Sequence, residues 1–320
     1  DKVRRVTDQL RHMVDEYSAE LISEFDRTPR QVSGYAAHRL LPSMGFDVAR
    51  LLVGSEGTLA LVVSATLSLV EIPRERQLLV LGYPNLVAAA RDVPSLLTYR
   101  PSAIEALDSA IVHTMRLRRG TAAVPEMPVG DAWLFVEFAD TIATVPLDEV
   151  AERVMRQGNA LTAEPIMDPA ARSALWRVRE DGAGLASNLA DGTRGKPGWE
   201  DAAVPPEQLA DYLEGLQLLQ QQHGFTGVLY GHFGAGCVHV RFDFDTATDS
   251  GRAAMRAFIR DAAELVARCG GSVSGEHGDG RARGELLELM YSPATLGAFR
   301  AIKRAFDPRG LLNPRVIVDA

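Results

Sequence analysis

The chain has 320 residues, of which 46% are hydrophobic and 24% charged, and its formal net charge is −8. This length can bury one large or two medium hydrophobic cores. The acidic balance disfavours nucleic acid as a partner, and the sequence has no apolar run near the roughly 18 residues of a membrane span and no signal-like start. Its two cysteines provide no disulfide framework, which favours a reducing, cytoplasmic compartment.

The first block, residues 1–72, opens with a charged helical stretch that runs through Glu24 and continues into a turn at residues 33–35. Its final part, residues 59–70, is an apolar run typical of a strand. The first methionine is Met13 rather than an initiating residue. We therefore expect this sequence to be the middle and end of a longer polypeptide.

The second block, residues 73–270, alternates strand patterns with helix patterns. Such an alternation favours an α+β domain in which helices pack against one face of an antiparallel sheet. The third block, residues 271–320, contains a glycine-rich loop and two helices. Strands are predicted at residues 77–82, 132–138 and 161–166, and helices at residues 85–97, 147–157, 169–190, 206–223 and 250–268.

Two histidines, His232 and His239, bracket a glycine turn between two runs of strand-forming residues. A two-residue turn at Ala235 and Gly236 would pair His232 with His239 and place both imidazoles on one face of the hairpin. Directly opposed side chains have Cβ atoms roughly 4.5–5.5 Å apart, close enough for two ring nitrogens to share a metal ion. The alternative is a pair of ordinary sheet histidines.

The glycine-rich loop of the third block carries adjacent Glu276 and His277. Successive residues of an extended chain point to opposite sides, so one can bind a metal while the other acts on a substrate. A metal held by His232, His239 and Glu276 would keep open positions for a substrate hydroxyl, and zinc fits these ligands best, ahead of iron or manganese. Alternatively, Glu276 caps a helix that starts near Arg283.

Four segments carry a family resemblance: residues 52–59 (LVGSEGTL), 231–239 (GHFGAGCVH), 274–280 (SGEHGDG) and 303–314 (KRAFDPRGLLNP). They resemble the signatures of the FAD-linked D-2-hydroxyacid dehydrogenases of the vanillyl-alcohol-oxidase class, which have a PCMH-type FAD-binding domain and an FAD-linked oxidase C-terminal domain. Two further segments, 198–205 and 280–283, are most similar to large bacterial members that carry a fused iron–sulfur part and act on D-2-hydroxyglutarate or D-lactate.

The resemblance implies FAD and a divalent metal, with zinc expected, as cofactors. Residues 1–72 would be the C-terminal part of the FAD-binding domain, residues 73–270 the substrate or cap domain, and residues 271–320 a segment that returns to the FAD domain. The family's diphosphate-binding loop does not occur upstream of Gly54, so an upstream FAD-binding segment is an expected partner.

Cys237 and Cys269 are the only cysteines, and a thiolate-held iron–sulfur cluster needs about four. A cluster would therefore belong to an iron–sulfur segment or an electron-transfer partner outside this sequence. The implied location is the cytoplasm, and a peripheral position at the inner membrane is the alternative.

The family match also implies flavin contacts around the loop of residues 54–58. Gly54 and Gly57 let backbone N–H groups approach a ligand closely, and the Thr58 hydroxyl would add a donor. The alternatives are an ordinary β-turn for this loop, a packed core ring for Tyr35 and a turn after a helix for Asn313. The expected flavin contacts are Ser33, Gly34, Tyr35, Gly54, Glu56, Gly57, Thr58 and Asn313.

Arg179 matches the family's carboxylate-binding arginine, and a guanidinium can hold a carboxylate through two hydrogen bonds. Its alternative role is an ion pair on a helix surface with Glu180 or Asp181. For a second, distal carboxylate the family uses a threonine and a lysine, and this chain has Ala183 and Trp199 in their places. Lys196 lies nearby and is expected to substitute.

The implied reaction is metal-assisted oxidation of a D-2-hydroxy acid, of the D-2-hydroxyglutarate or D-lactate type, with hydride transfer to flavin N5 and His277 as the general base. Ala235 and Cys237 replace the Asp and Asn of the family's metal motif, and losing such a supporting Asp weakens metal binding. Cys237 would share the face of His239 and offers a thiolate, against the simpler role of a small apolar residue.

Two other functions stay open. One is a flavoenzyme of the same superfamily that acts on a phenol or an alkyl-ether phosphate, and metal analysis would separate it because such enzymes generally lack the paired histidines. The other is a fragment or subunit without activity of its own that completes a flavin site with an upstream polypeptide.

Overall fold

The computed structural model describes residues 2–139, 146–185 and 193–319. The chain divides into two compact units. The sheet unit comprises residues 70–265, and the terminal unit combines residues 1–69 with residues 266–320. The last residues of the predicted helix at 169–190 lie outside the described residues.

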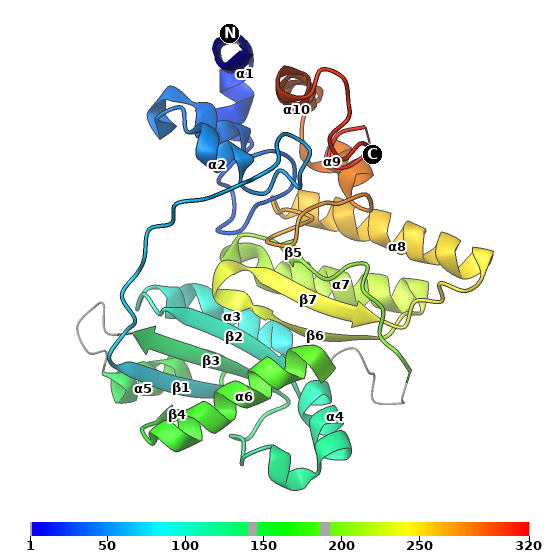
Figure 1. Ribbon diagram of the computed structural model, residues 1–320. Coiled ribbons are helices and arrows are strands. Elements are labelled where there is room, and N and C mark those ends of the chain that lie inside the picture. Colours follow the sequence, from blue (N-terminus) through cyan, green and yellow to red (C-terminus); the bar gives the residue numbers. More distant parts are fainter. Residues whose placement is uncertain (1, 140–145, 186–192, 320) are drawn as a thin grey trace. The chain divides into compact units, whose positions relative to one another are not determined.

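A seven-stranded sheet forms the centre of the sheet unit, with the strand order β4-β1-β3-β2-β6-β7-β5 and antiparallel pairing between all neighbours (Figure 1). Its central strands are long apolar runs, which favours burial on both faces. The strands are β1 (Arg76–Tyr83), β2 (Ala103–Asp108), β3 (Ala132–Ala139), β4 (Thr162–Ile166), β5 (Ala202–Ala203), β6 (Gly227–His232) and β7 (Cys237–Phe242).

Helices cover both faces of this sheet, which corrects the expectation of a single covered face. On one face, Val80 and Phe135 pack with Ile111 of α4 and Val178 of α6. On the other, α3 packs against β1, β2 and β3, with α7 beside it (Figure 1). Successive side chains of β1 point to opposite faces of the sheet, and those from Leu78 to Tyr83 are buried on either face. The helices are α3 (Leu86–Leu97), α4 (Ser109–Arg119), α5 (Leu147–Gln157), α6 (Pro169–Leu185), α7 (Leu209–His223) and α8 (Asp249–Arg268).

The terminal unit is helical in its described part. Its core joins the two ends of the chain, because Leu10 and Leu21 of α1 belong to one buried cluster with Phe299 and Ile302 of α10. Its helices are α1 (Lys2–Ser23), α2 (Val48–Leu52), α9 (Leu287–Met290) and α10 (Pro293–Phe306). Short 3-10 turns in the two units cover Ala37–Leu40, Pro42–Met44, Thr121–Ala123, Pro206–Gln208, Phe233–Ala235 and Gly284–Leu286.

The predicted strand at residues 59–70 does not form. Beyond Leu59, which is buried, this segment follows no regular structure, and its apolar side chains are exposed, with Val63 and Leu69 each 95% accessible. An apolar run becomes a strand only when a neighbouring strand satisfies its backbone. The described residues supply no such neighbour to this segment.

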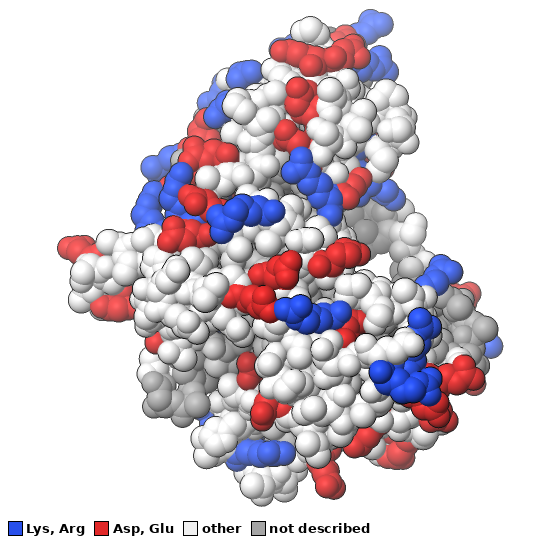
Figure 2. Space-filling view, turned by 180° about the vertical axis from the view of Figure 1, so that it is seen from behind, with Lys and Arg blue, Asp and Glu red and all other residues white. Residues whose placement is uncertain are grey.

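Charge is dispersed over the face of the molecule that Figure 2 shows, where Lys and Arg side chains are interspersed with Asp and Glu side chains. None of the helices in the described part of the chain combines the length and the hydropathy needed to cross a bilayer.

Candidate functional site

The histidine hairpin forms with a register that differs from the prediction by two residues. His232 pairs with Cys237, and His239 pairs with Tyr230. The connection is a 3-10 turn at Phe233–Ala235 followed by Gly236 in the left-handed region, rather than a two-residue turn. Phe233 is fully buried, so this residue belongs to the core and not to the strand. The pair nearest the turn is therefore His232 with Cys237. A shift of two residues preserves the face on which each side chain lies.

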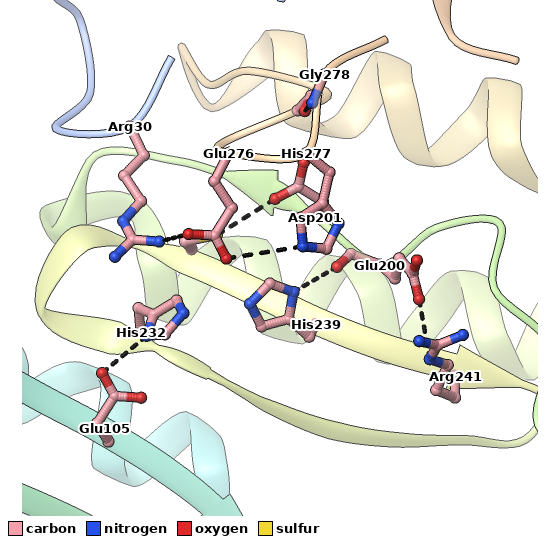
Figure 3. Close-up of polar contacts among 12 residues, drawn as sticks. Arg30, Glu105, Glu200, Asp201, His232, His239, Arg241, Glu276, His277 and Gly278 are labelled. Carbon is pink, nitrogen blue, oxygen red and sulfur yellow. Dashed lines mark hydrogen bonds and ion pairs between the residues drawn. The ribbon is translucent and has the colours of Figure 1, made fainter. Parts of the chain in front are cut away.

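His232 and His239 therefore lie diagonally on one face of the hairpin, as predicted, with ring centroids 5.2 Å apart. Each ring is fixed through Nδ1 (Figure 3). The Nδ1 atom of His232 lies 2.8 Å from Oε1 of Glu105, and that of His239 lies 2.6 Å from the backbone oxygen of Glu200. A carboxylate or carbonyl oxygen can only accept, so each Nδ1 atom carries a hydrogen, and in the neutral ring the lone pair then lies on Nε2.

Arg179 of α6 reaches the same face. Its Nε and Nη2 atoms lie 2.8 and 2.7 Å from Oε2 of Glu105, and its guanidinium lies over the Tyr230 ring at 5.4 Å. The alternative ion pair with Glu180 or Asp181 is not what holds it, because Asp181 pairs with Arg119 instead. Arg179 is thus fixed beside His232, with its Nη2 atom 3.4 Å from Nδ1 of that ring.

A buried carboxylate, from the residue just before β5, adjoins the hairpin. Asp201 is 1% exposed, and one of its carboxylate oxygens lies within 4.8 Å of a ring nitrogen of His239. The Cys237 thiol donates towards Oδ1 of Asp201 at 3.7 Å. Cys237 shares the face of His239, as expected from their spacing, and its sulfur is fully buried beside a carboxylate.

The residues considered for binding a distal carboxylate, Lys196 and Trp199, have different contacts. Lys196 forms an isolated bridge with Phe242, in which its backbone N donates to the Phe242 oxygen at 2.6 Å. Trp199 is buried, and its indole N–H donates to the hydroxyl of Tyr212 at 3.0 Å. Trp199 therefore has a core role, and the side chain of Ala183 lies outside the described residues.

Glu276 and His277 lie in the terminal unit, in a bend rather than in an extended segment. Oε1 of Glu276 lies 3.8 Å from Nε2 of His277, which corrects the expectation that the two side chains point to opposite sides. Glu276 also forms an ion pair with Arg30 (Figure 3). The alternative role as a helix cap is not seen, because no side chain caps the 3-10 turn at Gly284–Leu286.

The loop at residues 54–58 is anchored by the C-terminal part of the terminal unit, residues 279–313. Glu56 accepts hydrogen bonds from the backbone N–H groups of Asp279 (2.8 Å) and Gly280 (3.0 Å). Asn313 donates through Nδ2 to the Glu56 backbone oxygen at 2.7 Å, and Lys303 donates to the Thr58 backbone oxygen at 2.8 Å. The loop is thereby fixed to the Glu276 loop and to the last residues of the chain.

Some of the side chains expected to contact flavin point into this unit. Tyr35 is 1% exposed, and its hydroxyl lies 2.7 Å from Oγ1 of Thr58, which donates to the Ser55 oxygen at 2.7 Å rather than to a ligand. Burial raises the pKa of Tyr35 to about 12. Ser33 is also buried, and its hydroxyl accepts from the backbone N–H of Ser274 at 3.0 Å. The bare backbone of Gly54 and Gly57 is what this region exposes.

Comparison with known proteins identifies the family. Residues 72–317 match the family described as FAD linked oxidases, C-terminal domain. The chain belongs to this family. The D-2-hydroxyglutarate dehydrogenases of Pseudomonas putida and Escherichia coli are 32% and 30% identical to it over 94% and 92% of the chain. The chain spans only 31% and 30% of the lengths of these two relatives.

Solved structures support the fold of this FAD-linked oxidase domain. The crystal structure of p-cresol methylhydroxylase with substrate bound matches with a TM-score of 0.53 at 13% identity, covering 77% of this chain and 53% of that one. At this identity the similarity concerns the fold alone. It agrees with the predicted α+β class and with the PCMH-type resemblance.

Three residues of the chain that contact predicted site residues were missed from the sequence. They are Arg30, which pairs with Glu276, Glu105, which holds His232 and Arg179, and Asp201, which lies beside His239. Asp201 lies inside the segment 198–205 that carried part of the resemblance, so that segment was its available signal. Arg30 and Glu105 lie in segments with no recognisable motif.

Asp279 of the FAD-linked oxidase domain is expected to make stability depend on pH. Its carboxylate accepts from the Gly34 N–H at 2.6 Å, and burial raises its pKa from 3.8 to about 6. A group whose pKa is higher in the folded than in the unfolded state stabilises the fold at pH values below its unfolded-state pKa. This contribution is lost as the pH rises through the folded-state pKa of about 6. We expect the unfolding free energy, measured relative to Asp279→Asn, to fall by about 2 kcal/mol from pH 4 to pH 7.

Urea denaturation at several pH values measures this difference. Asp307→Asn in the same unit is the control, because Lys303 lowers the pKa of Asp307 to about 2 and its contribution is lost only as the pH falls below about 4. Asp307→Asn should give a constant difference between pH 5 and pH 7. A constant difference for Asp279→Asn as well would contradict the prediction.

Proposed function

We propose that the protein containing this chain oxidises a D-2-hydroxy acid, of the D-2-hydroxyglutarate or D-lactate type, to the 2-oxo acid with FAD. The observation that carries the proposal is the group of side chains on one face of the sheet. His232 and His239 both have Nδ1 occupied by fixed acceptors, and Arg179 is held next to them. Such a group combines two ligand nitrogens with a carboxylate-binding cation.

The donor set fits a divalent metal. We assign His232, His239 and Glu276 as its ligands, which gives two neutral nitrogens and one carboxylate oxygen, the composition of zinc sites that keep an open position. Acceptors on the Nδ1 atoms of ligating histidines fix the tautomer and the ring orientation, which is how metal-binding histidines are usually supported. Asp201 lies beside His239 and offers a further oxygen.

The loop at residues 54–58 fits a flavin through its backbone. Gly54 and Gly57 have positive φ, and a Cβ built on either would meet no atom within 4 Å. Their exposed backbone can therefore be approached closely by a ligand. The anchors from Glu56 and Asn313 hold the loop in place, which supports an indirect role for these two predicted residues.

Each site residue then has a defined task. Arg179 binds the substrate carboxylate and sets the approach of the reacting carbon, because a guanidinium fixed at two atoms orients its partner. His277, the residue next to the ligand Glu276, takes the proton of the 2-hydroxyl. Lys196 is assigned to the distal end of a longer substrate. When bound, FAD would supply the hydride acceptor, and a metal held by the assigned ligands would lower the pKa of the hydroxyl.

Flavin reduction in the purified full-length protein tests this function. D-2-hydroxyglutarate, D-lactate and glycolate are added without oxygen, and loss of the oxidised flavin absorbance is followed with and without a chelator. We expect one of the D-acids to reduce the flavin, the chelator to slow reduction and added zinc to restore it. The L-enantiomers serve as the control. Absence of reduction by all three acids in a flavin-containing protein would contradict the proposal.

A second function is favoured by one observation, the share of the relatives that this chain covers. It spans about 30% of the D-2-hydroxyglutarate dehydrogenase of Escherichia coli. We infer as the alternative that this chain is a fragment or subunit without activity alone that completes a flavin site with an upstream polypeptide, and that an iron–sulfur segment or electron-transfer partner passes the electrons on. A 320-residue product that is colourless alone and takes up flavin only with that polypeptide would favour it.

A further inference from the structure

Glu105 divides its two carboxylate oxygens between two residues of the proposed site. Oε1 lies 2.8 Å from Nδ1 of His232, and Oε2 lies 2.8 and 2.7 Å from Nε and Nη2 of Arg179. Glu105 is 8% exposed and lies within β2, between Ile104 and Ala106 in the interior of the sheet. A buried carboxylate at such a position costs free energy unless it is paired and hydrogen-bonded.

The protonation pattern follows from these contacts. A carboxylate accepts hydrogen bonds and donates none, so the imidazole of His232 must place its hydrogen on Nδ1. Its Nε2 atom is then the one with a lone pair. The same carboxylate fixes two donors of Arg179 and leaves the remaining N–H groups of the guanidinium for another acceptor. One side chain therefore determines the tautomer of a ring and the orientation of a cation.

We propose that Glu105 is a positioning residue that couples the carboxylate clamp Arg179 to the metal ligand His232. The inference deepens the proposed function, on which it rests for the meaning of the two partners. Glu105 touches neither substrate nor metal in this proposal. It acts by placing the lone pair of the neutral His232 ring on Nε2 and by fixing Arg179 beside that ring, so that a metal and a substrate carboxylate are received in one arrangement.

Glu137 shows what a purely structural glutamate looks like in the same sheet. It lies on β3, faces the same side as Ala103, and is 8% exposed like Glu105. Its partners are Arg76, at 3.5 Å, and the hydroxyl of Ser102, at 3.4 Å. Neither partner belongs to the proposed site. Glu137→Gln therefore reproduces the loss of one buried charge in this sheet without affecting His232 or Arg179.

Glu105→Gln is the decisive variant, because an amide has one acceptor and one donor where the carboxylate has two acceptors. The charged guanidinium forms the stronger hydrogen bond and takes the amide oxygen. The amide N–H then faces Nδ1 of His232, which must accept, and the ring hydrogen moves to Nε2. We expect the metal affinity to fall by about 10–100-fold, the range typical when the support of a ligand is lost.

The ring nitrogens of His232 report the tautomer directly. In metal-free protein with 15N-labelled histidine, we expect the Nδ1–H form in the wild type and the Nε2–H form in Glu105→Gln. Glu105→Asp keeps an acceptor-only group and should keep the wild-type tautomer. Zinc affinity and the KM for the D-acid are measured on the same proteins, and Glu137→Gln should leave all three readouts unchanged.

The outcomes separate the inference from the function on which it rests. An unchanged tautomer and an unchanged zinc affinity in a folded Glu105→Gln variant would overturn the positioning role. If Glu105→Gln does not fold, an Nε2–H ring in the wild-type protein would overturn it equally. If the tautomer switches although the wild type binds no zinc, Glu105 positions the ring and it is the metal assignment that fails.

Discussion

Replacing His277 with alanine is expected to slow flavin reduction by the D-2-hydroxy acid by about 10²–10⁴-fold, the usual contribution of a positioned general base. The ring lies beside the proposed ligand Glu276, with Nε2 3.8 Å from its Oε1 atom, and its side chain is 46% exposed. It is thus accessible to a substrate hydroxyl. Because His277 is not among the proposed ligands, its loss should leave the bound metal unchanged.

Anaerobic stopped-flow measurement of flavin reduction, together with metal analysis, tests this expectation. His12→Ala is the matched control, since His12 is an exposed histidine of the same unit on α1 and should leave the rate unchanged. Loss of metal together with loss of rate would move His277 into the ligand set. A rate within a fewfold of the wild type would remove it from the chemistry.

Most elements of the sheet unit could be predicted, because each carries an uninterrupted pattern of apolar residues that the fold buries. The helix at residues 147–157 was predicted with the bounds that the structure gives it, and β1 and β3 within a residue at each end. The strand β2 was missed because its six residues, Ala103–Asp108, include a glutamate and only two large apolar side chains. The role of Glu105 could therefore not be found, because its partners come from β6 and α6.

The histidine face was predictable and the register was not. Alternation along a strand fixes the face, and it holds for any shift by two residues. The register depends on whether Phe233 joins the strand or the core, and the packing of distant residues decides that. Residues 59–70 show the same limit, because an apolar pattern reports the tendency to be buried and says nothing about which strand will be the neighbour.

Gly236→Ala is expected to destabilise the sheet unit by more than about 2 kcal/mol, since two costs combine there. The residue has φ +66°, and an L side chain in the left-handed region costs roughly 1–2 kcal/mol. A Cβ at this position would also collide with the backbone oxygen of Val204. That oxygen cannot move away easily, because the Val204 N–H donates to the Gly236 oxygen at 3.0 Å and β5 pairs with β7.

The collision reaches the proposed site through β5. Ala202 and Ala203 pair with Val238 and Cys237. Glu200, two residues before β5, accepts from Nδ1 of His239 through its backbone oxygen. Displacing Val204 should therefore loosen the His239 ring and weaken zinc binding along with the fold. The measurements are urea denaturation of the chain and zinc titration.

Gly224→Ala isolates the backbone cost. Gly224 ends α7 with φ +71°, and a Cβ there would meet no atom within 4 Å. This variant should lose only about 1–2 kcal/mol of unfolding free energy and keep the zinc affinity of the wild type. Equal losses in the two variants would mean that Val204 yields without cost, and that the hairpin turn does not hold the imidazoles in place.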